Sequence, residues 1–229
     1  MKKYLFSLFL FYSTILFAQE NNSDTSFVIN KLTFKIQTSE ISSDQVALKI
    51  YRNTKLIQVD TLNAEGLSSL KFPDFDKDGY KDIMLTHIGN NFTYDLYLFD
   101  KARNLFRLVK GFDRFPESQQ LKTNSKYYFS YHRAGCADMN WVSDLFFINN
   151  FKTIHIGKIY GKGCDADIKL EPQIIEIYKI SYNTEDNEKL IARLPYQKNI
   201  PDFGGIWDFI KRYWEKNYLK VVPIRTTNR

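Results

Sequence analysis

The sequence has few prolines and glycines, which interrupt regular structure, and few cysteines and histidines, which form cross-links or bind metals. Its 229 residues include six prolines, ten glycines, three histidines and two cysteines. So little proline and glycine argues against a linker-rich or disordered chain. There is no C-x-x-C pair, and the histidines are scattered at positions 87, 132 and 155, so neither a thiolate metal site nor a redox pair is predicted.

Basic runs are also missing. The chain has 32 Lys and Arg against 26 Asp and Glu, but no run of basic residues exceeds two. A diffuse positive charge of this kind is typical of solvated faces, so no nucleic acid is predicted as a partner.

The only long apolar run stands at the start. Lys2 and Lys3 give a positive beginning, residues 4–17 are mostly apolar, and Ala18 precedes a polar segment. This layout predicts a secretory signal peptide over residues 1–18, with a retained membrane anchor as the alternative. No cysteine follows to carry a lipid, and no later run reaches the ~20 apolar residues of a membrane span. We therefore expect a periplasmic or secreted product with one domain over residues 19–229.

Export gives the two cysteines a structural interpretation. In an oxidising compartment an even number of cysteines is expected to pair, and Cys136 with Cys164 is the only pairing available. Closing this loop should stabilise the fold by roughly 3 to 4 kcal/mol.

Aromatic residues are abundant, at 16% of the chain with fifteen Tyr and nineteen Phe. Such side chains favour strands, and short segments of alternating polarity recur through the chain. We expect a mainly β fold, with antiparallel sheets in a compact propeller-like, sandwich or barrel arrangement. The strands are expected at 27–36, 46–51, 56–59, 70–72, 83–87, 94–99, 106–109, 127–131, 145–148, 153–160 and 174–180.

One C-terminal helix is expected after a cap at Asp202 or Gly205. Its apolar residues recur at spacings of three and four, which is typical of a helix that docks on a sheet. A membrane-surface helix is the alternative, because the opposite face is basic. The apolar face consists of Ile206, Phe209, Ile210, Tyr213 and Trp214.

The most informative segment is the D-x-D-x-D-G-x-x-D string over residues 74–82. Carboxylates at alternate positions of a tight loop supply the oxygens that Ca²⁺ prefers, and Gly79 permits the sharp turn. A solvated Asp-Gly turn is the alternative interpretation. The predicted calcium ligands are Asp74, Asp76, Asp78, the Tyr80 carbonyl and Asp82.

The flanks of this loop are short apolar runs, and the twelfth position is Leu85 where an EF-hand has Glu. A calcium loop between strands resembles the FG-GAP or VCBS type of repeat, but only one copy is present. The chain is similar to small periplasmic calcium-binding proteins with one such loop, a family typified by a xanthomonad immunity lipoprotein. That resemblance, over roughly residues 65–165, implies a non-enzymatic inhibitor that binds a peptidoglycan hydrolase through a protruding loop. The lipobox of the family's type is missing.

The segment Tyr131, His132 and Arg133 is the candidate partner-binding loop, because aromatic and Arg side chains often anchor interfaces. An ordinary turn at a strand end is the alternative for any one of these residues.

Two other classes stay open. A cell-surface or cell-wall glycan-binding module could use the calcium loop and exposed aromatics such as Trp141. A carboxylate-dependent glycan hydrolase needs two carboxyls at a defined separation, which the sequence does not reveal. No serine nucleophile, zinc or phosphate-loop motif is present. The candidate carboxyls are Asp138, Asp144, Asp165, Asp167 and Glu171.

Overall fold

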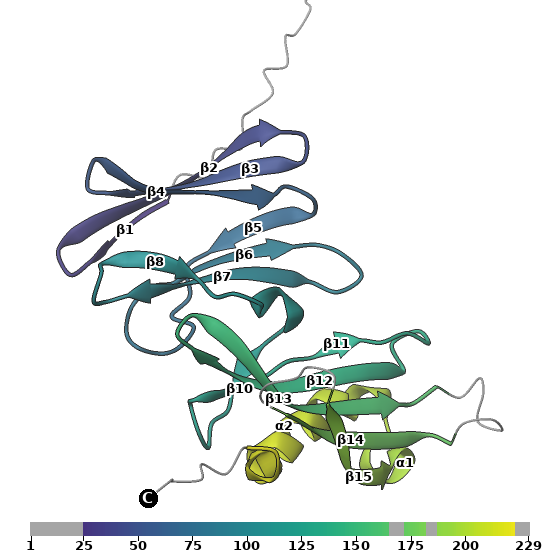
Figure 1. Ribbon diagram of the computed structural model, residues 1–229. Helices are drawn as coiled ribbons and strands as arrows, with labels where there is room; N and C mark the ends of the chain where they lie inside the picture. The colour runs from purple at the N-terminus through teal and green to yellow at the C-terminus, as the bar shows by residue number, and fades with distance from the viewer. Residues whose placement is uncertain (1–24, 165–171, 182–186, 223–229) are drawn as a thin grey trace, which may run out of the picture.

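The structure is a computed structural model that describes residues 25–164, 172–181 and 187–222. The predicted signal peptide lies outside these residues. Three antiparallel sheets are stacked one after another, and a helix covers the last of them (Figure 1).

The first sheet is a four-stranded meander in the order β1-β2-β3-β4. The sequence predicted a single strand over residues 27–36, and this was wrong because a hairpin turns at Asn30 and Lys31. Both residues have positive φ, 51° and 65°, a conformation that Asn tolerates better than most residues. The strands are β1 Thr25–Ile29, β2 Leu32–Ser42, β3 Gln45–Arg52 and β4 Lys55–Asn63.

The second sheet is another four-stranded meander, in the order β5-β6-β7-β8. The predicted calcium loop joins its first two strands. Its strands are β5 Leu67–Lys71, β6 Ile83–His87, β7 Thr93–Asp100 and β8 Leu105–Leu108.

The third sheet has seven strands in the order β15-β14-β13-β12-β10-β9, and β11 also pairs with β12. Strand β15 was not predicted, because its apolar residues do not alternate regularly with polar ones. Its strands are β9 Gln119–Gln120, β10 Tyr127–Phe129, β11 His132–Arg133, β12 Asn140–Asn149, β13 Lys152–Lys162, β14 Ile174–Ile180 and β15 Glu188–Pro195.

The predicted helix is confirmed as α2, Ile206–Asn217, with Gly205 at its cap position. Its apolar face is buried against the third sheet, where Ile210 and Trp214 are fully buried. The membrane-surface alternative is wrong, because the sheet already covers that face. The remaining helices are short: α1 Tyr196–Asn199, η1 Phe112–Arg114, η2 Phe203–Gly205 and η3 Tyr218–Lys220.

Three apolar clusters hold the layers together. Because side chains alternate along a strand, β7 serves two clusters. Tyr97 and Phe99 face the first sheet, whereas Leu96 and Leu98 pack with Tyr128 of the third sheet. The third cluster lies between the last sheet and α2. The second sheet is therefore packed on both faces.

The expected fold class is confirmed as mainly β, with antiparallel sheets and one C-terminal helix of more than a single turn in the described residues. A closed barrel is not formed, since each sheet of the described chain keeps two edge strands. The arrangement is a layered stack of sheets.

Candidate functional site

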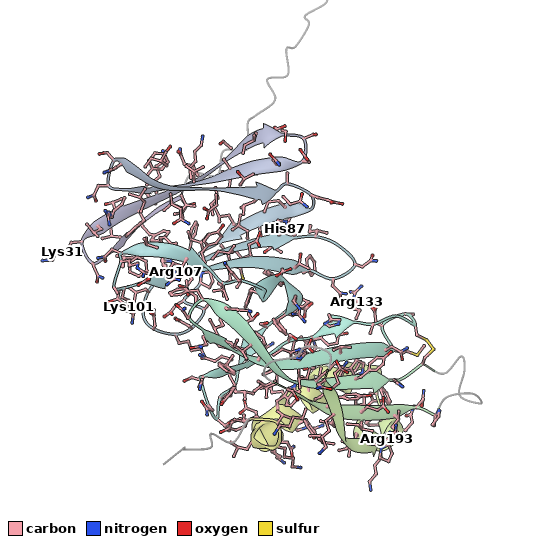
Figure 2. The ribbon with its side chains drawn as sticks, in the orientation of Figure 1. Lys31, His87, Lys101, Arg107, Arg133 and Arg193 are labelled. Carbon is pink, nitrogen blue, oxygen red and sulfur yellow. A yellow bond between two sulfur atoms is a disulfide. The ribbon has the colours of Figure 1, made fainter. Side chains whose placement is uncertain are left out.

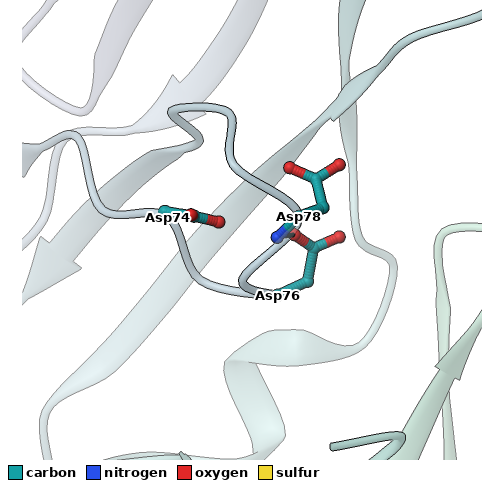
Figure 3. A group of neighbouring side chains, drawn as sticks. All are labelled: Asp74, Asp76 and Asp78. Carbon is teal, nitrogen blue, oxygen red and sulfur yellow. Dashed lines mark hydrogen bonds between the residues drawn. The ribbon is translucent and has the colours of Figure 1, made fainter.

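The loop over residues 74–82 brings three carboxylates together. One oxygen from each of Asp74, Asp76 and Asp78 can be chosen so that all three lie within 4.8 Å of one another (Figure 3). Asp74 is exposed, while Asp76 and Asp78 are half-buried. The acids at alternate positions of the motif are therefore neighbours in the structure.

Backbone hydrogen bonds shape this loop. The amide of Gly79 donates to Asp74 Oδ2 over 3.1 Å, and the amide of Tyr80 donates to Asp78 Oδ1 over 2.9 Å. Lys77 and Gly79 have positive φ, 60° and 91°, which is typical of tight turns. Gly79 suits the second position because it has no Cβ to strain there. Loop amides therefore hold the carboxylates of Asp74 and Asp78 in place.

Asp82 has a different environment from the other three acids. Its Oδ2 accepts the Phe75 amide over 2.8 Å, and its Oδ1 accepts the Phe99 amide over 3.0 Å. The residue is almost fully buried, and burial raises the pKa of its carboxyl to about 7 despite these two hydrogen bonds. Asp82 is not in the convergent group. In this structure it connects the start of the loop, at Phe75, to strand β7, at Phe99.

Like charges affect the pKa of Asp76. Burial first, and then the neighbouring carboxylate of Asp78, raise this pKa above its usual value. A cation among the three acids would relieve this repulsion.

Lys101 supplies one positive charge to the loop. Its Nζ lies 3.1 Å from Asp78 Oδ2 and 4.7 Å from the centre of the Tyr80 ring. Figure 2 shows Lys101 at the end of the second sheet. The lysine side chain is half-exposed, so it can move away when another cation enters.

Two aromatic residues anchor the loop in different clusters. Phe75 stacks on Tyr128, with ring centres 5.0 Å apart, in the cluster between the second and third sheets. Tyr80 packs against Phe99, with ring centres 5.4 Å apart, at the cluster between the first and second sheets. Gln120 Nε2 also donates to the Asp76 carbonyl over 3.3 Å. The loop therefore touches all three sheets or their shared cores.

The donor set fits a hard cation. Carboxylate oxygens with a backbone carbonyl are the ligands that Ca²⁺ takes, and no sulfur or imidazole lies in the convergent group. Asp74, Asp76 and Asp78 would hold the ion, which would supply positive charge and rigidity to the loop.

The predicted disulfide is confirmed. Cys136 and Cys164 are bonded, with Cα atoms 5.7 Å apart (Figure 2). The bond joins the β11–β12 connection to the chain after β13. It therefore tethers the turn of the β11–β12 hairpin to the end of β13.

The candidate partner loop is less prominent than expected. Tyr131 is half-buried and packs on Trp207, with ring centres 5.1 Å apart. His132 and Arg133 form the short strand β11 on the edge of β12. The side chain of Arg133 is 57% exposed and reaches Asp138 over 3.4 Å. Within this segment Arg133 is the most accessible contact for a partner (Figure 2).

Sequence reasoning missed a buried polar group in the third sheet. Asp144 is 2.9 Å from His155 Nε2 and 3.8 Å from His132 Nδ1, and Ser130 donates to it over 3.4 Å. His155, His132 and Ser130 lie 11, 12 and 14 positions from Asp144 in the sequence, so no local motif marks them. Pairing of β10, β11 and β13 around β12 brings them together.

The other proposed site residues are dispersed. Asp165, Asp167 and Glu171 lie outside the described residues. Asp138 is half-exposed and pairs with Arg133, while Asp144 is buried in the group just described.

The expectation that Trp141 is exposed was wrong. Trp141 is fully buried and donates its indole N–H to the Tyr196 hydroxyl over 3.1 Å. Strand pairing turns its ring inward beneath Gly161, where a larger residue would collide with it. Trp141 therefore offers no surface to a glycan.

No known family model matches the chain. No curated protein matches it either. One solved structure is similar, described as a Xanthomonas protein related to the type IV secretion system. It is 14% identical, with a TM-score of 0.46, and the match covers 76% of this chain and 96% of that one. A likeness at this level does not establish a shared fold.

In the described part of the chain, every helix is too short or too polar to cross a bilayer.

Proposed function

We propose that this chain is an exported calcium-binding protein that acts by binding another protein, with a peptidoglycan hydrolase as the leading candidate partner. Its place of action would be the periplasm or the outside of the cell. The disulfide supports this location, because such bonds persist in oxidising compartments. The role of calcium would be structural.

The observation that carries the proposal is the position of the acidic loop. Three convergent carboxylates occupy a loop whose aromatic residues, Phe75 and Tyr80, reach two different cores. A cation bound there would fix how the second sheet meets its neighbours. A surface held rigid in this way loses less conformational entropy when a partner binds.

An inhibition assay tests the partner class. The protein with calcium is added at stoichiometric excess to peptidoglycan hydrolases of several classes, and their rates of cell-wall lysis are followed. Slower lysis by one class is the expected result. Unchanged rates for every class would overturn the hydrolase proposal.

Two controls separate the other classes of function. Turnover of glycan or peptide substrates by the protein alone would favour an enzyme. Retention on polysaccharide resins would favour a glycan-binding module. Affinity capture from a native periplasmic or culture fraction, with and without a calcium chelator, would identify the natural partner and its calcium dependence.

A further inference from the structure

An open groove lies where the edge strands β4 and β8 approach the β12–β13 hairpin. Its volume is about 1020 Å³, and its lining includes the continuous runs 57–62, 105–108 and 149–152. Successive side chains of a strand point to opposite faces. Runs of consecutive residues therefore mean that strand edges, with their backbone groups, line much of this groove.

The outer edge of β8 has backbone groups available for pairing. The amide of Val109 donates to the Leu96 carbonyl of β7 over 2.7 Å, so it points inward. Amides alternate in direction along an antiparallel strand. Those of Phe106 and Leu108 therefore point away from β7, into the groove.

The same alternation applies to β4. The amide of Ala64 donates toward β3, to the Asp44 carbonyl, over 2.9 Å. The amides of Val59 and Thr61 in β4 therefore point outward. Both strands are edges of their sheets.

The edge of β8 already pairs with another part of the chain at one end. Lys110 donates its amide to the Phe151 carbonyl over 2.9 Å and accepts the Thr153 amide over 3.1 Å. This is a parallel bridge between Lys110 and Lys152. The geometry of β8 therefore permits strand addition, and the next two positions along the same edge, Leu108 and Phe106, are open.

The groove has exposed apolar side chains along its strands and lysines at one end. The one acid among its lining residues is Asp60 on β4, which accepts a hydrogen bond from Gln58 over 2.8 Å. Val59 and Leu108 are large apolar residues that are 51% and 39% exposed. At the hairpin end lie Lys110 and Lys152, both exposed and, in the described chain, without an acidic partner. Arg107, another lining residue, has its guanidinium carbon 3.9 Å from the centre of the Phe151 ring.

From these observations we propose that the groove binds an extended segment of a protein partner by strand addition to β8, with acidic side chains of that segment facing Lys110 and Lys152. Main-chain hydrogen bonds from Phe106 and Leu108 would provide the pairing, and alternate apolar side chains would contact Val59 and Leu108. Charge complementarity selects an acidic segment over a basic one.

This inference deepens the proposed function and rests on it only for the existence of a protein partner. Synthetic peptides test the groove directly, without a hydrolase. If no peptide binds, the inhibition assay can still detect inhibition of a hydrolase. If no hydrolase is inhibited, peptide binding to the groove can still be measured.

The probes are fluorescent peptides of nine residues, the length of β4. They alternate Val and Thr and carry two Asp at either the N-terminal or the C-terminal end. Matched peptides carry two Asn in place of Asp, or a central Pro. We expect one Asp peptide to bind at least about tenfold more tightly than its Asn and Pro counterparts. Amide NMR shifts should change at Phe106 and Leu108.

Variants distinguish the contribution of backbone hydrogen bonds to peptide binding from the contribution of side chains. Leu108→Pro removes an outward amide and keeps the β7 hydrogen bonds, and it should weaken binding about tenfold or more. Leu108→Thr keeps the amide and should bind within a few fold of the parent protein. Lys110→Glu combined with Lys152→Glu should weaken binding of the Asp peptide about tenfold, whereas the control pair, Lys189→Glu in β15 combined with Lys198→Glu in α1, should not.

Three results would overturn the proposal. The first is no saturable binding of any peptide by a protein whose circular dichroism shows that it is folded. The second is binding that Leu108→Pro leaves unchanged, with NMR shifts elsewhere. The third is a stable dimer in light scattering that Leu108→Pro dissociates, which would assign the groove to a second copy of this chain.

Discussion

At the scale of single residues, the acidic loop separates two roles that its sequence motif combines. Asp74, Asp76 and Asp78 converge, whereas Asp82 connects the loop to β7 by accepting the Phe75 and Phe99 amides. A buried carboxyl that accepts two backbone amides is a structural element whether or not an ion is bound.

Calcium should raise the melting temperature of the protein, because a ligand that binds only the folded state stabilises it by mass action. Asp78→Ala should abolish this rise, and Asp78→Asn should reduce it while keeping an oxygen for the Tyr80 amide. The control Asp113→Ala changes an exposed acid outside the loop. Scanning fluorimetry with calcium and with chelator makes the measurement. If both conditions give one melting curve for the parent protein, the loop is only a turn.

Lys101 should compete with calcium, because its ammonium already lies 3.1 Å from Asp78. Lys101→Met removes that charge and keeps most of the aliphatic stem. We expect calcium affinity to increase about two- to tenfold in isothermal titration, with the larger effect at low salt. Lys81→Met alters an exposed lysine of the same loop and serves as the control. Weaker calcium binding by Lys101→Met would mean that the lysine organises the site instead.

At the scale of elements, contacts between segments far apart in the sequence determine how α2 packs on the third sheet. Helix α2 covers the third sheet, and its Glu215 also holds the connection between β9 and β10. The Glu215 carboxylate accepts the Lys122 amide over 2.7 Å, the Thr123 amide over 2.9 Å and the Thr123 hydroxyl over 2.6 Å.

Glu215 should make stability depend on pH. Burial alone raises its pKa, but the hydrogen bonds from Thr123 and Lys122 outweigh burial and lower the pKa below the usual 4.5. A lowered folded-state pKa gives stability that is present above the unfolded value and lost as pH falls through the folded value. The difference in unfolding free energy between the parent and Glu215→Gln should therefore be largest near pH 7 and shrink below pH 4.5. Urea titrations at several pH values measure it. A difference that grows on acidification would contradict this assignment.

The disulfide between Cys136 and Cys164 closes a loop with a sequence separation of 28. Replacing both cysteines with Ser should lower the unfolding free energy by about 3 to 4 kcal/mol, since the unfolded chain regains the entropy of an open loop. Urea denaturation of both proteins under oxidising conditions measures the change. A reductant should lower the parent protein to the level of the variant, and equal stabilities in air would contradict the prediction.

At the scale of the whole molecule, the second sheet is the shared layer. One face of β7 contributes Tyr97 and Phe99 to the first core, and the other contributes Leu96 and Leu98 to the next. Loss of either core would expose this sheet, so the layers depend on one another.

Thermal unfolding should therefore be a single cooperative transition. Calorimetry should give a ratio of calorimetric to van't Hoff enthalpy near one, which is the test of two-state behaviour. Phe75→Ala removes the ring that stacks on Tyr128 between the second and third sheets. It should lower the melting temperature of the whole transition. Two separate transitions in the parent protein would show that the sheets unfold as independent units and would contradict the single-domain prediction.

The sequence by itself determined the local features of this protein. Strand periodicity, the apolar stripe of α2, the positions of Asp74, Asp76 and Asp78, and the one available cysteine pairing all depend on residues close in sequence or on simple counting. The hairpin at Asn30 and the strand β15, both missed from the sequence, mark where local patterns were ambiguous.

Only the tertiary structure decided the rest, because it depends on which strands pair and which faces pack. Pairing turned Trp141 inward, brought His132 and His155 to Asp144, and gave Asp82 the Phe99 amide 17 positions away. Sheet order left the outer amides of β4 and β8 facing one groove. These contacts join residues that no spacing rule connects, since their separations are set by chain topology.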